Sequence, residues 1–217
     1  MILAGALCAA LIAGAAWRLR ALDLSGALAA FVVGTCTFAA GGIPGAAILL
    51  AFFTSSVVLT RIGRQKKRGL VDVAKGGPRD AMQVLANGGV ATVCILLAVV
   101  LGHLWALAFA GAYAAATADT WGTEIGTLAS QLPRSLIDGR PLATGLSGGI
   151  TRAGTAAEVA GAFFIALVAA GTSVATDARS VAAVTAGGIA GALADSALGA
   201  TVQARRWCPA CERVCEA

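Results

Sequence analysis

Apolar runs follow one another along this 217-residue chain, and they limit the folds that it can adopt. Each run is near the length that a helix needs to cross about 30 Å of hydrocarbon. We therefore predict an all-α fold, a polytopic transmembrane helical bundle of about seven spans, with six or eight as the alternatives. The predicted spans are 1–16, 24–40, 44–60, 84–101, 104–118, 156–172 and 181–203.

The composition agrees with a membrane protein and excludes an average soluble domain. Hydrophobic residues make up 58% of the chain and charged residues 12%, and there are 28 glycines. Glycine and alanine within the runs suit helices that pack closely on one another. No basic residue precedes the first run and Arg18 follows it, so we expect a retained helix and not a cleaved signal peptide.

The basic residues predict the orientation, because cytoplasmic loops carry an excess of Lys and Arg. With the N-terminus outside, fifteen of the 16 Lys and Arg residues fall on one side, and Arg179 is the exception. We expect an integral protein of the bacterial inner membrane type, with a membrane domain over 1–203. Its cytoplasmic parts are predicted to be the loops 61–80 and 119–153 and the tail 204–217. No nucleic-acid partner is expected.

The first stretch with potential chemistry is 73–92, where a turn at Pro78 leads into a helix. Asp80, Gln83 and Asn87 are three and four residues apart, so they share one helical face. With Lys75 and Arg79 just upstream, this helix N-terminus suits an anionic ligand, and the acid suits a bridging metal. The alternative is an ordinary helix cap beside positive-inside charges.

The second stretch is "TADTWGTEIGTLAS", residues 117–130, which contains Asp119 and Glu124. On a continuous helix these acids point about 140° apart, so they share a ligand only if the helix bends, for which Gly122 is the candidate. If the helix runs straight, we keep Asp119 as the metal ligand and give up Glu124. Oxygen ligands of this kind suit Mg²⁺ completed by substrate phosphates. The alternative is that both acids flank a membrane exit.

The third stretch, 141–155, is a glycine-rich loop. Backbone N–H groups at Ser147, Gly148 and Gly149 could surround an oxyanion, and Arg152 could add charge. No GxxxxGK[ST] sequence occurs anywhere in the chain, so this is not a Walker A loop. The alternative is a flexible linker.

The fourth stretch, 187–206, places glycines, one acid and one amide on one face of the last span. A neighbouring helix should be able to approach this face closely, so that Asp195 is buried in the bundle. Gln203 lies on the same face. The alternative is a packing acid paired to Arg79 or Arg152. The tail adds Cys208, Cys211 and Cys215, but three thiols without a following histidine cannot complete a four-ligand zinc site, so zinc is not expected here.

Four stretches taken together resemble a multi-pass membrane family known as domain of unknown function 92. They are "RDAMQVLANGG", "ADTWGTEIGTL", "SGGITRAGT" and "DSALGATVQ", and the resemblance covers roughly residues 20–215. The family includes the plant chloroplast phytyl-phosphate kinase of vitamin E synthesis. Family members usually continue past the cysteine segment to a last span, so we expect this chain to be truncated. The matched positions are Arg79, Asp80, Gln83, Asn87, Asp119, Glu124, Ser147, Gly148, Gly149, Asp195, Ser196 and Gln203.

The resemblance implies transfer of a phosphoryl group from a nucleoside triphosphate, for which CTP is the candidate, to a prenyl monophosphate such as phytyl phosphate. Phosphoryl transfer depends on positioning and charge neutralisation. We expect Asp119, Glu124 and Asp195 to hold Mg²⁺. Other polar groups should bind and orient the phosphates, with Asp80 as a further catalytic acid; they are Lys75, Arg79, Gln83, Asn87, Ser147, Gly148, Gly149, Arg152, Ser196 and Gln203. The rival hypotheses are a lipid or anion transporter or flippase, a membrane scaffold, a prenyl-alcohol kinase and a cytidylyltransferase.

Overall fold

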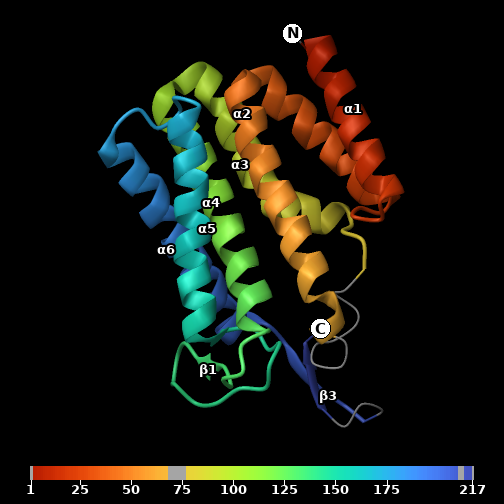
Figure 1. The fold of residues 1–217 in the computed structure, drawn as a ribbon, viewed down its shortest axis with the longest axis vertical. Helices are drawn as coiled ribbons and strands as arrows, with labels where there is room; N and C mark the ends of the chain where they lie inside the picture. The colour runs from red at the N-terminus through yellow and green to blue at the C-terminus, as the bar shows by residue number, and fades with distance from the viewer. Residues whose placement is uncertain (1, 68–76, 210–212, 217) are drawn as a thin grey trace.

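A computed structural model shows the chain as a helical bundle with two small β-hairpins at one end (Figure 1). The structure describes residues 2–67, 77–209 and 213–216, and the side chains of 2, 63–67, 205, 208 and 213–216 lie outside that description. In the described part the helices are α1 (Ile2–Arg18), α2 (Leu24–Lys67), α3 (Ala81–Leu101), α4 (His103–Gly126), α5 (Arg152–Gly171) and α6 (Ala178–Val202).

Helix α2 consists of two helical segments joined at a kink. Gly42 has φ 58° and ψ −148°, a conformation that glycine adopts without steric cost, and Pro44 follows it and lacks a backbone N–H. Figure 1 shows that the chain reverses its direction at this kink. The two predicted apolar runs 24–40 and 44–60 are therefore the two arms of one kinked element.

Four helices within the described residues are long and apolar enough to cross a membrane, namely α2, α3, α5 and α6, and α1 is a shorter apolar helix. The structure thus agrees with a polytopic helical membrane protein. The count of seven spans stays a prediction, because α4 does not meet the same criteria of length and composition. The outward N-terminus also stays a prediction.

The described fold is mostly helical, as predicted, and short strands accompany the helices. β1 (Arg134–Ser135) pairs antiparallel with β2 (Gly149–Ile150), and β3 (Arg205–Cys208) pairs antiparallel with β4 (Arg213–Glu216). Both hairpins lie between or beyond helices, where backbone groups without a helical partner pair with one another. The predicted loop 119–153 is also shorter than expected, since α4 continues to Gly126.

Helix α4 is the centre of the bundle and contacts α2, α3, α5 and α6. Phe109, Tyr113 and Ala118 on α4 are fully buried. Gly188 and Gly191 of α6 lie against α4: a Cβ at Gly188 would stand 2.7 Å from the Cβ of Ala114, and one at Gly191 would stand 2.6 Å from the Cβ of Ala115. The prediction that glycines let a neighbouring helix approach this face of α6 is confirmed.

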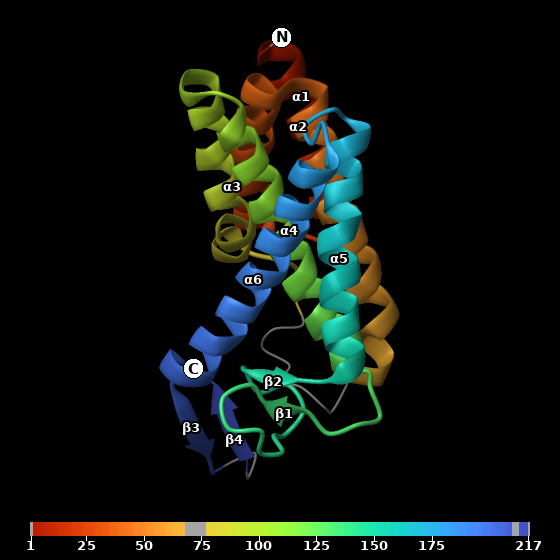
Figure 2. The same ribbon diagram turned by 90° about the vertical axis from the view of Figure 1, so that its left-hand side faces the viewer.

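The ends of the helices fall into two groups. The N-terminus, the kink at Gly42 and the turns at Gly102 and 172–177 lie at the upper end of the bundle in Figure 1. At the opposite end α4 and α6 finish, α5 begins and both hairpins lie, as Figure 2 shows from the side. We call this opposite end the polar end, because the predicted site residues on α4 and α6 and in the 141–155 loop lie toward it.

Candidate functional site at the polar end

Asp80 and Gln83 form the N-terminal cap of α3. The backbone N–H of Gln83 donates to Asp80 Oδ1 at 2.8 Å, and the backbone N–H of Asp80 donates to Gln83 Oε1 at 3.2 Å. This reciprocal capping box satisfies two backbone donors that a helix start leaves unpaired. Asp80 is exposed. Its geometry shows the helix cap, and its role as a catalytic acid stays a prediction.

The same cap holds Arg79 against the turn between α1 and α2. The backbone N–H of Arg79 donates to the Ala21 carbonyl at 3.0 Å, and the Arg79 carbonyl accepts from the N–H of Asp23 at 3.0 Å. Gly26 on α2 packs directly on the Arg79 carbonyl, where a Cβ would overlap the oxygen. The backbone that carries the Arg79 side chain is therefore fixed from two sides.

Arg79 lies within electrostatic reach of Glu124 on α4. Burial lowers the pKa of the half-buried Arg79, and the negative charge of Glu124 acts in the opposite direction. The hydroxyl of Thr60, on the second arm of α2, donates to Glu124 Oε1 at 2.9 Å. Glu124 thus connects α2, α4 and the residue that precedes the α3 cap.

Helix α4 runs without a break from His103 to Gly126, so the predicted bend at Gly122 is absent from the described helix. Gly122 instead makes room for Glu158 of α5: a Cβ there would stand 2.5 Å from Glu158 Cγ and 2.7 Å from its Oε1. Glu158 is 7% exposed, and its Oε2 is buried without a hydrogen-bond partner. The glycine therefore serves close helix packing, and Asp119 and Glu124 do not share a ligand.

On the opposite face of α4 from Glu124, Asp119 lies within electrostatic reach of Asp195 on α6 and of Glu158. We name Asp119, Glu158 and Asp195 the acid cluster. Asp195 is exposed, which corrects the prediction that it is pressed into the bundle; Figure 2 shows the end of α6 leaning away from α5. Among the described residues, no group of three His, Cys, Asp or Glu side chains is close enough to hold a metal by itself.

The glycine-rich loop packs against the end of α6. Gly148 has φ 79°, and a Cβ there would overlap Ala200, while a Cβ at Gly199 would stand 2.9 Å from that of Ser147. The third and fourth predicted stretches thus meet about one helical turn from Asp195. Because Ala200 fills the space at Gly148, this glycine allows close contact with α6, and the predicted oxyanion wrap by backbone N–H groups stays a prediction.

An apolar pocket lies on the Arg79 side of α4. The free space within it and at its open mouth together amounts to about 860 Å³. Side chains of α1 and of both arms of α2 form most of its wall, and Tyr113 closes it toward α4. Its polar lining comes from the start of α3, at Arg79, Gln83 and Asn87. The predicted polar face of α3 therefore borders an apolar space.

The model of the family described as "Integral membrane protein DUF92" matches residues 7–217. The chain belongs to the DUF92 family. Protein PGR of Arabidopsis thaliana is 35% identical to this DUF92 chain, with 91% of this chain and 77% of that protein covered. An uncharacterised membrane protein of Methanocaldococcus jannaschii is 37% identical, with 83% and 74% covered. Protein VTE6, chloroplastic, of Arabidopsis thaliana is 27% identical, with 72% and 49% covered. No solved structure matches the chain.

The DUF92 stretches thus separate into two groups on either side of α4. Arg79, Gln83, Asn87 and Glu124 lie on the pocket side, whereas the acid cluster and the glycine-rich loop lie on the side of α5 and α6. Arg152 is exposed at the start of α5, Ser196 is half-buried, and Gln203 ends α6. Lys75 and Cys211 lie outside the described residues, as do the side chains of Cys208 and Cys215.

Sequence reasoning missed Glu158 in this DUF92 chain, because it falls within the apolar run 156–172. A signal was available: an acid inside a predicted span is costly and marks a functional candidate by default. What the sequence could not show is that Glu158 lies against Gly122 and near Asp119.

Proposed function

We propose that this chain is an integral membrane prenyl-phosphate kinase. It transfers a phosphoryl group from a nucleoside triphosphate to phytyl or another isoprenyl monophosphate, and CTP is the candidate donor. The observation that carries the proposal is the place of Arg79. It lines an apolar pocket with two amide side chains, and it lies beside a carboxylate at the polar end of the bundle. One ligand with an apolar tail and an anionic head fits this combination.

The pocket supplies the tail site. Small-molecule sites are mostly apolar concavities in which a few polar groups fix the orientation. Here alanine, valine, leucine and phenylalanine side chains form the wall, and the cationic group and the amides come from one short segment of chain. An isoprenyl chain would lie among the apolar side chains of the wall. Its phosphate would contact Arg79, with Gln83 and Asn87 as hydrogen-bond partners.

Phosphoryl transfer asks for little covalent chemistry from the protein. The acceptor oxygen is already anionic, so no strong general base is required. Arg79 would neutralise and position the acceptor phosphate, and Glu124, held by Thr60, would orient the guanidinium. The side chain of Arg79 is backed by a fixed backbone, which favours a single productive position.

The acid cluster would hold the metal of the donor. Asp119 lies within electrostatic reach of both Asp195 and Glu158, and Glu158 Oε2 has no hydrogen-bond partner, so a cation beside Asp119 would offset the repulsion between these acids. Mg²⁺ is usually held by one or two carboxylates together with substrate phosphates, so a complete protein cage is not required. Asp119 and Asp195 are the proposed ligands, and Mg²⁺ bound there would neutralise charge on the donor phosphates. The donor would reach the acceptor around the end of α4, which lies two residues beyond Glu124.

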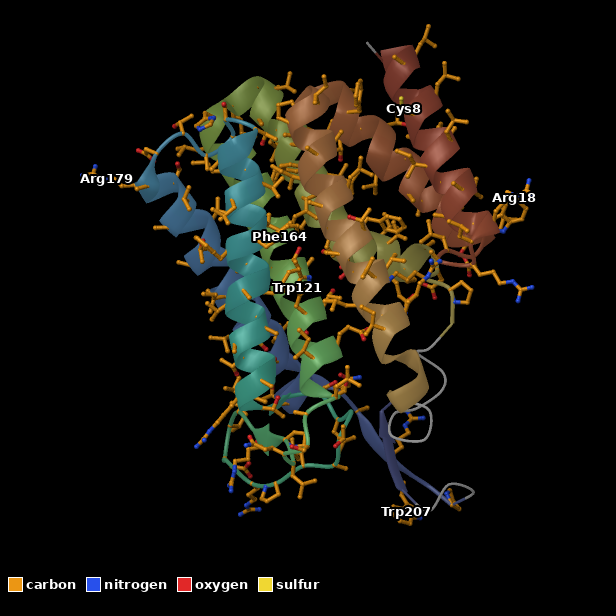
Figure 3. The ribbon with its side chains drawn as sticks, viewed as in Figure 1. Cys8, Arg18, Trp121, Phe164, Arg179 and Trp207 are labelled. Carbon is orange, nitrogen blue, oxygen red and sulfur yellow. The ribbon has the colours of Figure 1, made fainter. Side chains whose placement is uncertain are left out.

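The test is turnover by the purified protein in lipid vesicles, with phytyl or geranylgeranyl phosphate, Mg²⁺ and each nucleoside triphosphate in turn. The expected product in mass spectrometry is the lipid diphosphate. Arg79→Gln should lose activity, while the matched Arg179→Gln, at the opposite end of the bundle (Figure 3), should keep it. A nucleotide-linked lipid would instead show a cytidylyltransferase. Passage of the lipid phosphate across the bilayer without turnover would show a transporter or flippase.

A further inference from the structure

At the end remote from Arg79 the apolar pocket is bounded by the contact between α1 and the first arm of α2, and we call this end the closed end. Gly5 of α1 lies against the ring of Phe38, with no room for a Cβ between them, and both residues line the pocket. One helical turn along, Gly34 lies against Ala9. The close approach of the two helices therefore leaves the Phe38 ring as the wall at the end remote from Arg79.

The depth of the pocket follows from helix geometry. Ala16, near the turn that holds Arg79, and Gly5 both line the pocket, and they lie eleven residues apart on α1. At a rise of 1.5 Å per residue, this corresponds to about 16 Å between the two levels. A chain whose phosphate is held at Arg79 thus has a limited length before it meets Phe38.

We propose that the Gly5 and Phe38 contact sets the length of the isoprenoid chain that this protein accepts, with Phe38 as the residue that determines specificity. The proposal rests on the proposed function only in its choice of ligand, an isoprenyl phosphate. Chains that end before Phe38 leave apolar space unfilled, and longer chains must displace the ring or bend out through the open side. Each carbon buried in such a pocket changes affinity, and one methylene can change it by about tenfold.

Two substitutions change the depth in opposite directions. Phe38→Ala removes a half-buried ring and extends the pocket toward Gly5. Cys8→Phe adds a ring at an exposed residue of α1 that lines the pocket, so it fills the space without overpacking a buried core. Phe163→Ala is the matched control, because Phe163 lies on α5, is 46% exposed and does not line the pocket.

The experiment measures binding, with no turnover required. The 217-residue chain in detergent is titrated by native mass spectrometry with geranyl, farnesyl, geranylgeranyl and longer prenyl monophosphates. Phe38→Ala should raise the affinity for the next longer chain relative to the wild-type optimum by about tenfold. Cys8→Phe should move the optimum to a shorter chain, and Phe163→Ala should leave it in place.

The outcomes separate this proposal from the kinase assignment. An unchanged length profile in both Phe38→Ala and Cys8→Phe overturns the role of the closed end, even if the wild-type protein makes lipid diphosphate. A shifted profile without any turnover supports the closed end and argues against the kinase. Absence of binding for every prenyl phosphate overturns both.

Discussion

Replacing Gly26 by alanine should displace Arg79 without touching its side chain. A Cβ at Gly26 would overlap the Arg79 carbonyl, and it would stand 3.1 Å from the Arg79 carbonyl carbon and 3.3 Å from that of Asp80. The obstructing atoms are backbone, held by hydrogen bonds to Ala21 and Asp23, so they cannot turn aside as a flexible side chain would. The segment must retreat by on the order of 1 Å to restore ordinary contact distances.

Two magnitudes follow from this displacement. Overpacking of this kind lowers the free energy of unfolding by about 1 to 3 kcal/mol, whereas alanine in place of glycine in a helix raises it by up to about 1 kcal/mol. A misplacement of about 1 Å at a substrate-positioning group can lower the rate by about 100-fold. Gly26→Ala should therefore lose far more turnover than its modest loss of stability explains.

The assay pairs thermal unfolding with lipid diphosphate formation, and Gly187→Ala on α6 is the control. Gly187 has no atom within 4 Å of its added Cβ, so this variant should gain a little stability and keep wild-type turnover. If Gly26→Ala unfolds at a lower temperature but turns over like the control, the position of Arg79 does not matter for activity. Arg79 then is not the group that positions the acceptor phosphate.

Three further predictions concern the rest of the site. Gly122→Ala should cost about 1 to 3 kcal/mol in a chemical unfolding experiment because its Cβ meets Glu158, and Glu158→Ala in the same chain should remove most of that cost; equal losses in both backgrounds would contradict the contact. Glu124→Gln keeps an acceptor for Thr60 but removes the negative charge beside Arg79, so we expect turnover to fall while the unfolding temperature stays near wild type; full turnover would remove Glu124 from the site. Hydrogen bonds from Ser180 lower the pKa of Asp177 from its ordinary value of 3.8. The ionised carboxylate therefore stabilises the fold at pH values above 3.8, and this stabilisation is lost as the pH falls through the lowered pKa. The unfolding temperatures of wild type and Asp177→Asn should therefore converge below pH 3.8, and a gap independent of pH would contradict that assignment.

Periodicity predicted much of the bundle, because the signals are local. The glycine face of α6 was predicted from its spacing, and Gly188 and Gly191 do contact α4. The polar face of α3 was also predicted, and Gln83 and Asn87 border the pocket. At Asp80 the sequence predicts either a helix cap or a catalytic acid. Its hydrogen bonds with Gln83 show the cap, and the catalytic role stays a prediction.

The remaining features depend on which helices pack together, which the spacing of residues along one helix does not show. The bend expected at Gly122 is replaced by a straight helix, because α5 approaches there and Glu158 occupies the space. Asp195 was expected to be buried, but the end of α6 leans away and exposes it. Asp119 and Glu124 fall on different faces of α4, as helix geometry predicts for a helix without a bend.

Transfer of a terminal phosphoryl group to a prenyl monophosphate at the polar end is tested directly with a labelled donor. The purified protein is incubated with geranylgeranyl phosphate, Mg²⁺ and CTP that carries heavy oxygen in its γ-phosphate. We expect a lipid diphosphate with the label in its terminal phosphate, formed by the wild-type protein and lost in Asp119→Asn. Undiminished labelling in Asp119→Asn would contradict the role of the acid cluster. Failure to form a labelled lipid diphosphate with CTP, and with each other nucleoside triphosphate labelled in the same way, would contradict the kinase activity itself.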